Sequence, residues 1–239
     1  MKITSLFIFS IFISFIQTKA QDITFGIKGG INYSNIGTLN HYGPRGGNNV
    51  TPSEDFYYSD NHDSGYHYGG YFKINFNYFY LKPEVVYTSL NNSYDLALEK
   101  SEWLQTSLDI GLFFGYRVYG LITIYAGPSI SMINDRQLEG NETKGNTPWS
   151  YEKTNLGVGL GATIEFGRFG IDLRYLYGLT KVEHIEIDMV RSTYGTNRGA
   201  LQEYNPGQLI LSATIDVFSF GGEKKKRRAG SDWRNHKNL

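Results

Sequence analysis

The sequence predicts an all-β protein, an eight-stranded antiparallel up-and-down transmembrane β-barrel. Three observations favour this fold class: an N-terminal export signal, eight segments in which apolar and polar residues alternate with a period of two, and connections that alternate between short and long. The composition agrees, because 19 Tyr, 15 Phe and 28 Gly suit strands and tight turns better than helices.

The first twenty residues have the pattern of a secretory signal peptide. Lys2 supplies the positive start, residues 3–16 are largely apolar, and the small residues Thr18 and Ala20 precede a cleavage site before Gln21. The apolar run is short for a membrane-spanning helix, which needs about 20 residues. We therefore divide the chain into a signal peptide at 1–20, a barrel domain at 21–220 and a basic, disordered tail at 221–239.

Each alternating segment has one apolar face that is almost free of charge and one face of small and polar residues. Pro83 and Pro128 fall inside such segments, where a closed barrel has no free edge, so we expect them to mark bulges or unpaired strand ends. The eight predicted strands are residues 23–33, 66–76, 79–88, 104–114, 122–132, 156–166, 169–180 and 208–217.

The connections between these segments predict which ends of the strands lie together. Short turns are expected at 77–78, 117–120 and 167–168, and long loops at 36–63, 91–101, 134–151 and 183–206. This alternation is typical of outer-membrane barrels, whose short turns are periplasmic and whose long loops are extracellular. An even number of strands then places both termini in the periplasm.

The apolar faces could point either outward to lipid or inward to the cavity of a soluble barrel such as a lipocalin. Two features favour lipid. Gly26, Gly157 and Gly159 on the polar face fit the crowded interior of a narrow barrel. Phe gathers near the short turns and Tyr near the long loops, as in the aromatic belts at two membrane interfaces.

The polar faces carry five basic and five acidic residues. Buried charges are costly unless they are paired, and the interior of an eight-stranded barrel is about wide enough for side chains alone. We expect these residues to form a salt-bridged plug with a structural role, rather than a proton or ion path. They are Lys28, Lys73, Lys82, Glu84, Asp109, Arg117, Glu165, Asp172, Arg174 and Asp216.

A second group of ionisable residues lies in or beside the first long loop and consists of His41, Asp60, His62, Asp63 and His67. Such residues could bind a metal ion or transfer protons at the rim of a barrel. No nucleophile motif accompanies them, and loops commonly collect His and Asp. We therefore predict a solvated loop, with no catalytic residue, no metal site and no cofactor.

Four segments carry a family resemblance, at 25–33 (FGIKGGINY), 81–87 (LKPEVVY), 159–166 (GLGATIEF) and 171–180 (IDLRYLYGLT). In order and spacing the chain resembles the PorT-like outer-membrane β-barrel family, which is widespread in Bacteroidetes. The resemblance implies an outer-membrane location and an eight-stranded barrel. It implies little about activity, although one type of member is linked to protein secretion. The chain departs from the family pattern at its end, because the final aromatic strand is followed by the basic tail.

We expect a non-enzymatic outer-membrane protein that acts through its extracellular loops or as an accessory of a surface or secretion complex. One alternative is a small pore for solutes or ions, and another is an outer-membrane enzyme that uses the rim His and Asp residues. The expected partners are outer-membrane lipid, the barrel-assembly machinery during biogenesis, and proteins of a surface or secretion complex. The formal net charge of zero gives no attraction to nucleic acid.

Overall fold

The computed structural model describes residues 22–44, 56–95, 100–139, 152–192 and 195–221. The predicted signal peptide at 1–20 and all of the predicted tail beyond Gly221 lie outside these ranges. No helix in the described part of the chain is long and apolar enough to cross a membrane.

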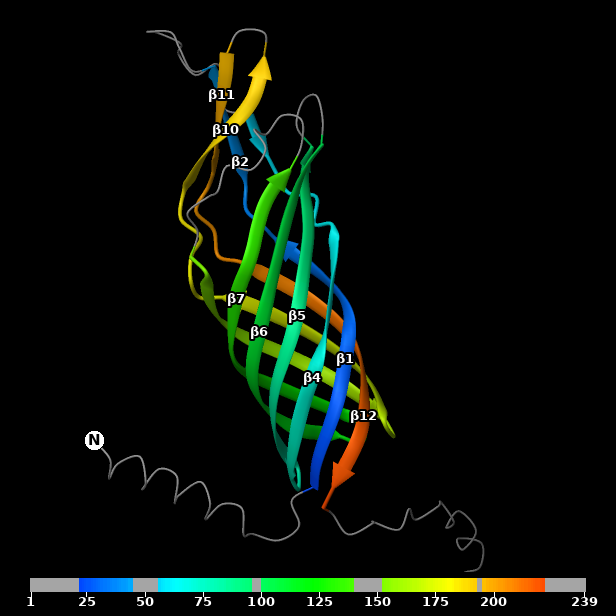
Figure 1. Ribbon diagram of the computed structural model, residues 1–239. Coiled ribbons are helices and arrows are strands. Elements are labelled where there is room, and N and C mark those ends of the chain that lie inside the picture. The colour runs from blue at the N-terminus through cyan, green and yellow to red at the C-terminus, as the bar shows by residue number, and fades with distance from the viewer. Residues whose placement is uncertain (1–21, 45–55, 96–99, 140–151, 193–194, 222–239) are drawn as a thin grey trace, which may run out of the picture.

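Eight strands close into a barrel in the order β1-β12-β9-β8-β7-β6-β5-β4, and every neighbouring pair is antiparallel (Figure 1). The predicted fold class is therefore confirmed. The barrel strands are β1 (Asp22–Asn35), β4 (Ser64–Phe76), β5 (Phe79–Asp95), β6 (Lys100–Tyr119), β7 (Ile122–Glu139), β8 (Thr154–Phe166), β9 (Phe169–Gly178) and β12 (Gly207–Phe220).

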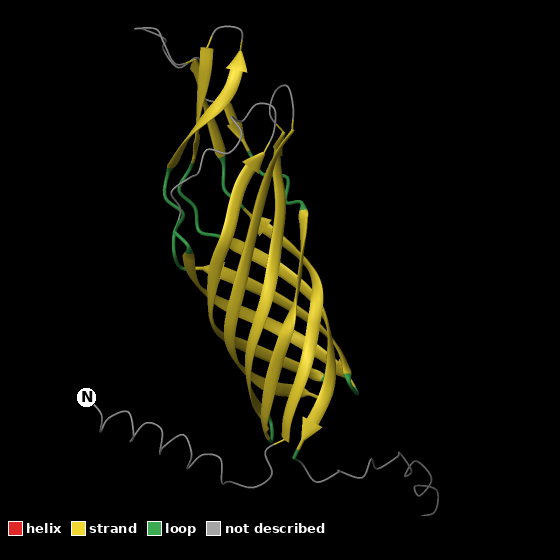
Figure 2. Cartoon of the chain, viewed as in Figure 1, coloured by secondary structure: helices red, strands yellow, loops and turns green. Residues whose placement is uncertain are grey.

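A second sheet stands beyond one end of the barrel (Figure 2). It consists of β2 (Leu39–Pro44), β3 (Phe56–Tyr58), β10 (Ile185–Ser192) and β11 (Gly195–Leu201), in the order β10-β11-β2-β3. We call this sheet the lid, the barrel end that carries it the loop end, and the opposite end the short-turn end. The lid corrects the prediction of long loops at 36–63 and 183–206. Its central pairing, β2 with β11, joins segments that are far apart in the sequence, so a local sequence pattern does not predict it.

Two other predicted loops are shorter than expected, because the wall formed by β5, β6 and β7 continues past the predicted strand ends. β5 runs to Asp95, β6 begins at Lys100 and β7 runs to Glu139, so most of 91–101 and the start of 134–151 are strand. The inward residues there, including Tyr94 and Trp103, are buried. These strand ends extend beyond the part of the barrel whose outer surface is apolar, so their outward residues need not be apolar. The alternation of apolar and polar residues that predicts a strand is therefore weak there.

The three turns at the short-turn end are tight, as predicted. Asn77, Gly120 and Gly167 have φ values of 59°, 51° and 70°, in the left-handed region that hairpin turns use. β6 extends to Tyr119, so its turn to β7 is limited to residues 120–121.

The predicted orientation of the two faces is confirmed, because the apolar side chains point outward and remain exposed, as for Leu160 at 65% and Leu173 at 50%. One position differs from the prediction. In the pairing of β12 with β1, Phe25 lies opposite Phe218 and Gly26 opposite Asp216, so Val217 is the extra residue of a β-bulge. Beyond this bulge Phe218 and Phe220 take the outward positions.

The two prolines lie neither in bulges nor at strand ends, so that expectation was wrong. Pro83 pairs with Leu112 of β6, and Pro128 pairs with Val158 of β8. On its other side each proline falls in a gap of the ladder, where pairing stops and resumes without a change of register. Proline lacks an N–H, so it removes the ladder hydrogen bond on one side while the strand stays paired on the other.

Candidate functional site

Four alternate strands of the ring, β1, β9, β7 and β5, send buried side chains to the middle of the lumen. We call this set the central ion layer. Alternate strands of a barrel commonly contribute the side chains of one layer, because their inward positions lie at the same height. The layer consists of Lys28 from β1, Asp172 and Arg174 from β9, Tyr125 from β7, and Lys82 and Glu84 from β5.

Glu84 and Asp172 hold the three cations of this layer. The Arg174 guanidinium contacts Glu84 through two nitrogens, Nη1 to Oε1 and Nη2 to Oε2, the second at 3.0 Å. Lys28 Nζ lies 3.5 Å from Glu84 Oε2 and 3.6 Å from Asp172 Oδ1. Lys82 Nζ lies 4.0 Å from Glu84 and 3.7 Å from Asp172. Each cation therefore has a carboxylate within reach, which offsets part of its desolvation.

Two hydroxyl groups donate hydrogen bonds to one carboxylate oxygen of Asp172, whose side chain is fully buried. The Tyr125 hydroxyl donates to Asp172 Oδ2 over 2.6 Å, and Thr163 Oγ1 donates to the same oxygen over 2.8 Å. The Tyr125 oxygen in turn accepts from Arg174 Nε at 2.9 Å. Asp172 is thus linked to Arg174 both directly and through Tyr125.

Aromatic rings fill the space beside these charges. Tyr80, Phe113 and Tyr125 form a buried cluster, in which the Phe113 and Tyr125 rings meet edge to face at 5.4 Å. Arg174 Cζ lies 4.0 Å from the centre of the Phe113 ring, and Lys82 Nζ lies 4.4 Å from the centre of the Tyr125 ring. The sequence did not identify Phe113, because it stands in an apolar run. Its inward position between two glycines was the available signal.

The other four alternate strands build a second layer nearer the short-turn end. Lys73 Nζ of β4 lies 2.9 Å from Glu165 Oε1 of β8 and 3.5 Å from Asp216 Oδ2 of β12. Arg117 of β6, whose side chain is 46% exposed, reaches Glu165 at 3.7 Å. The Tyr71 hydroxyl donates to Asp216 over 2.7 Å. We call these residues the short-turn layer.

Asp109 belongs to neither layer. Thr88 Oγ1 donates to its Oδ2 over 2.6 Å, and Ser107 Oγ donates to its Oδ1 over 3.0 Å. Among the described residues no basic side chain comes within 4.0 Å of it, so hydroxyl donors take the place of the expected charge partner. The ten predicted residues thus form two layers and one separate carboxylate.

The rim residues do not form one cluster. His62 Nδ1 lies 2.8 Å from Asp60 Oδ2, whereas Asp63 contacts Ser93 and Lys100. His67 points into the lumen and its Nε2 lies 2.8 Å from Ser212 Oγ. The side chain of His41 lies outside the described part of the structure. Within that part, no group of three or more His, Asp or Glu residues is arranged to hold a metal ion.

The carboxylate contacts at the rim attach the chain to the extended barrel wall. Asp60 Oδ2 accepts from the Ile36 N–H at 3.2 Å and from Asn92 Nδ2 at 3.1 Å. The hydrogen bond from Ser93, with a smaller contribution from Lys100, holds the pKa of Asp63 below its ordinary value. These contacts join β5 to the segment that enters β4.

The lid packs on the same wall through an apolar core. Its buried members are Leu39 and Leu201 from the lid, Ile36 from the end of β1, and three residues of the extended wall, Tyr94, Trp103 and Leu138. The Tyr94 hydroxyl donates to the backbone oxygens of Ile36 and Gly37 over 3.1 and 3.2 Å. Burial raises the pKa of Tyr204, which packs against this core, to about 12.

A closed ring of outward apolar strands around a charged and packed lumen defines an integral membrane β-barrel protein. The chain belongs to the family of the outer membrane protein beta-barrel domain, whose model matches residues 15–183. The protein is therefore an outer-membrane β-barrel.

Comparison with solved structures finds similar barrels at low sequence identity. Neisserial surface protein A is 12% identical, over 81% of this chain and 97% of that chain, with a TM-score of 0.44. OprG from Pseudomonas aeruginosa is 15% identical, over 83% and 98%, with a TM-score of 0.48. Ail, the attachment invasion locus protein of Yersinia pestis, is 13% identical, over 84% and 100%, with a TM-score of 0.42. No curated protein matches the chain.

Proposed function

We propose that this protein is a non-enzymatic outer-membrane protein that presents its lid at the cell surface. There it acts as an adhesin or receptor, or as an accessory of a surface or secretion complex. The observation that carries this proposal is the obstructed lumen: two ion layers and an aromatic cluster lie across it, and the lid is a structured sheet beyond the loop end that can contact other molecules.

The lengths of the connections support the proposed orientation. In outer-membrane barrels the short turns face the periplasm and the long connections face outward. β1 starts and β12 ends at the short-turn end (Figure 1), which supports a periplasmic location for both ends of the barrel domain. The four segments that carry the family resemblance, among them 25–33 and 171–180, support a PorT-like member of the family.

The two alternatives have weaker support. A pore needs a continuous lumen, whereas Glu84 and Arg174 meet across this one. A rim enzyme needs acids and bases that converge, whereas Asp60 and Asp63 each serve contacts that join the loop end to the wall.

Photo-cross-linking in intact cells tests the proposal. A benzophenone amino acid replaces Tyr57, which lies on β3 of the lid and is 62% exposed. The matched control replaces Tyr119, which is 80% exposed at the short-turn end. We expect a discrete cross-linked product from the lid position that does not form from the control. The absence of any product from the lid in intact cells would contradict a function that depends on it.

A further inference from the structure

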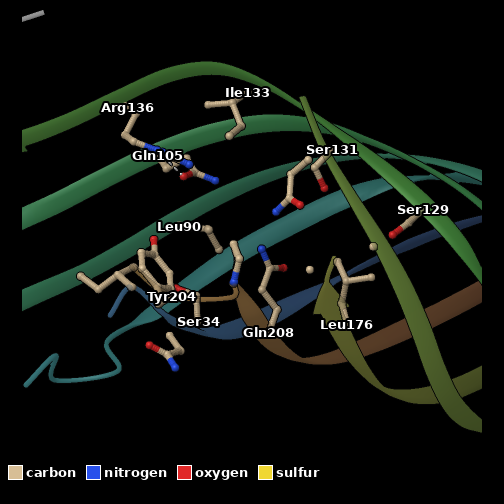
Figure 3. A pocket seen from close by; sticks show the side chains of 17 residues that line it. Ser34, Leu90, Gln105, Ser129, Ser131, Ile133, Arg136, Leu176, Tyr204 and Gln208 are labelled. Atoms are coloured by element: carbon tan, nitrogen blue, oxygen red, sulfur yellow. Dashed lines mark hydrogen bonds between the residues drawn. The ribbon is translucent and has the colours of Figure 1, made fainter. Parts of the chain in front are cut away.

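A small chamber lies in the lumen between the lid and the central ion layer. Gln105, Ser129 and Ser131 from β6 and β7 line one wall and face Ser34 and Gln208 from β1 and β12 (Figure 3). Its volume is about 30 Å³. That volume has room for about two water molecules, or for one solute of similar size.

The chamber presents hydrogen-bonding atoms that the protein itself leaves without partners. Ser34 Oγ, Ser129 Oγ, Asn155 Oδ1 and Gln208 Oε1 are buried, and none of them has a hydrogen-bond partner among the described residues. The residues Ser34, Ser129 and Gln208 are only 4%, 6% and 8% exposed. Buried polar atoms without partners are costly, so a molecule that donates hydrogen bonds to them would be stabilised there.

The chemistry of the lining selects the class of that molecule. Two of these atoms are amide oxygens, which only accept, and two are hydroxyl oxygens, which accept as well as donate, so all four can accept a hydrogen bond. None of the described residues that line the chamber is acidic. The one basic residue, Arg136, donates from Nε to Gln105 at 2.9 Å and stacks 5.5 Å from the centre of the Trp103 ring. The lining therefore favours an uncharged hydrogen-bond donor over an ion.

The position of the chamber limits how a molecule reaches it. Tyr204 and Ile36 border it on the side of the lid, and both belong to the apolar contact between the lid and the wall. On the opposite side lies the central ion layer with Arg174 and Glu84. A second cavity of about 20 Å³ shares Ser129 and Leu176 with the chamber and is lined by Arg174 and Glu84. Because these two side chains meet across the lumen, we expect a molecule to enter from the loop end.

We propose that this chamber is a binding site for a small uncharged molecule that carries two or more N–H or O–H donors. The proposal goes beyond the surface function of the lid and does not depend on it.

The chain has no cysteine, so Ser129→Cys introduces a single thiol into the chamber with little change of volume. Ser59→Cys, at an exposed position of the loop end, is the matched control. The full-length protein in detergent is alkylated with iodoacetamide, an uncharged amide, and with iodoacetate, an anion of the same size. For each protein we divide the rate of alkylation by iodoacetamide by the rate of alkylation by iodoacetate. We expect this ratio to be higher in Ser129→Cys than in Ser59→Cys, by about fivefold for each hydrogen bond that the amide gains in the chamber.

Competition by three probes of similar shape then tests the donor requirement. Acetamide is uncharged and donates, acetone is uncharged and only accepts, and acetate is an anion. We expect acetamide to slow alkylation of the Ser129→Cys protein while acetone and acetate do not, and Gln208→Leu to weaken this protection about fivefold. Heat-modifiable gel mobility verifies folding, and Ser131→Cys replaces Ser129→Cys if that variant does not assemble.

Three results would overturn the proposal. A thiol in the chamber that reacts with neither reagent shows that solutes do not enter. Equal protection by all three probes shows no selection for donors. An absence of protection by acetamide in both thiol variants shows that the chamber holds water only.

Discussion

Arg174 and Glu84 form a two-point ion pair across the full width of the barrel. Arg174 lies on β9 and Glu84 on β5, and these strands are separated by four steps around the ring in either direction. The pair therefore joins opposite walls, which no backbone ladder connects. Lys73 and Glu165 do the same from β4 and β8 in the short-turn layer. Ion pairs of this kind connect opposite strands of the barrel across the lumen and obstruct it.

The first prediction concerns the charge balance of the central ion layer. Glu84→Gln leaves three cations, Lys28, Lys82 and Arg174, for which Asp172 is then the only carboxylate contact within the described ranges. Breaking a buried pair in this way is expected to cost about 3–5 kcal/mol. Arg174→Met leaves two cations and two carboxylates and is expected to cost less. Urea unfolding in detergent measures both.

Two further variants serve as controls for this prediction. Combining Glu84→Gln with Arg174→Met should recover part of the stability lost in Glu84→Gln alone, because the excess of positive charge falls. Glu203→Gln breaks the exposed pair with Lys181 and should leave unfolding unchanged. If Arg174→Met is the more damaging single change, charge balance does not control the stability of this layer.

A second prediction tests the face that contacts lipid. Leu173 is an outward residue of β9, paired with Ala162 and Leu211 near the middle of the strand. Leu173→Arg places a charge in the apolar band and is expected to cost about 2–4 kcal/mol. Heat-modifiable gel mobility after refolding into lipid measures the folded fraction. Leu173→Val is the control and should assemble normally, and normal assembly of the Arg variant would contradict the assigned facing.

A third prediction concerns conduction through the barrel. We expect no steady open channel from the unmodified protein in planar bilayers, because flow would require the ion pairs of both layers to separate. Replacing Lys28 and Lys73 with Ala loosens both layers and is expected to produce a weak, cation-selective conductance, since acids then outnumber bases. Lys181→Ala, at an exposed position, is the control and should produce no conductance. Ohmic conductance from the unmodified protein would favour a pore.

The fourth prediction separates the lid from the barrel. Trp103 is fully buried in the core between the lid and the wall, and Trp103→Ala should destabilise that contact by about 3–5 kcal/mol. Limited proteolysis in proteoliposomes is expected to cleave the lid faster while the barrel keeps its heat-modifiable mobility. Tyr57→Ala, at an exposed lid position, is the control. Loss of the whole barrel in Trp103→Ala would show that the two parts fold as one unit.

The fifth prediction follows from Asp63. The Ser93 hydroxyl and Lys100 lower its pKa below the ordinary value of 3.8, so its contacts stabilise the fold fully above that value. This stabilisation is lost as the pH falls through the lowered pKa and the carboxylate is protonated. Hydrogen exchange at the Asn61 amide, which bonds to the Ser93 oxygen, should then rise beyond its intrinsic pH dependence. In Asp63→Asn this additional rise in exchange at low pH should disappear. If the exchange at Asn61 still rises in that variant, a group other than Asp63 causes it.

The sequence predicted the parts of the fold that depend on local pattern. A period of two identified all eight barrel strands and the facing of residues such as Leu173 and Asp172, because burial in lipid on one side imposes the alternation directly. The short turns at Asn77 and Gly167 were predictable for the same reason, since hairpin geometry restricts which residues can occupy them. The bulge at Val217 was missed, because a single extra residue reverses the facing without changing the composition.

The sequence by itself determined that this protein is an eight-stranded barrel with a charged interior and apolar exterior. Only the tertiary structure decided which charges meet, because closing the ring places β5 opposite β9 and β4 opposite β8. It also decided that the first and last long connections form a lid, since β2 pairs with a strand far along the chain. Alternation depends on the environment of each residue and its neighbours, whereas these contacts depend on ring closure and strand register, which bring distant residues together.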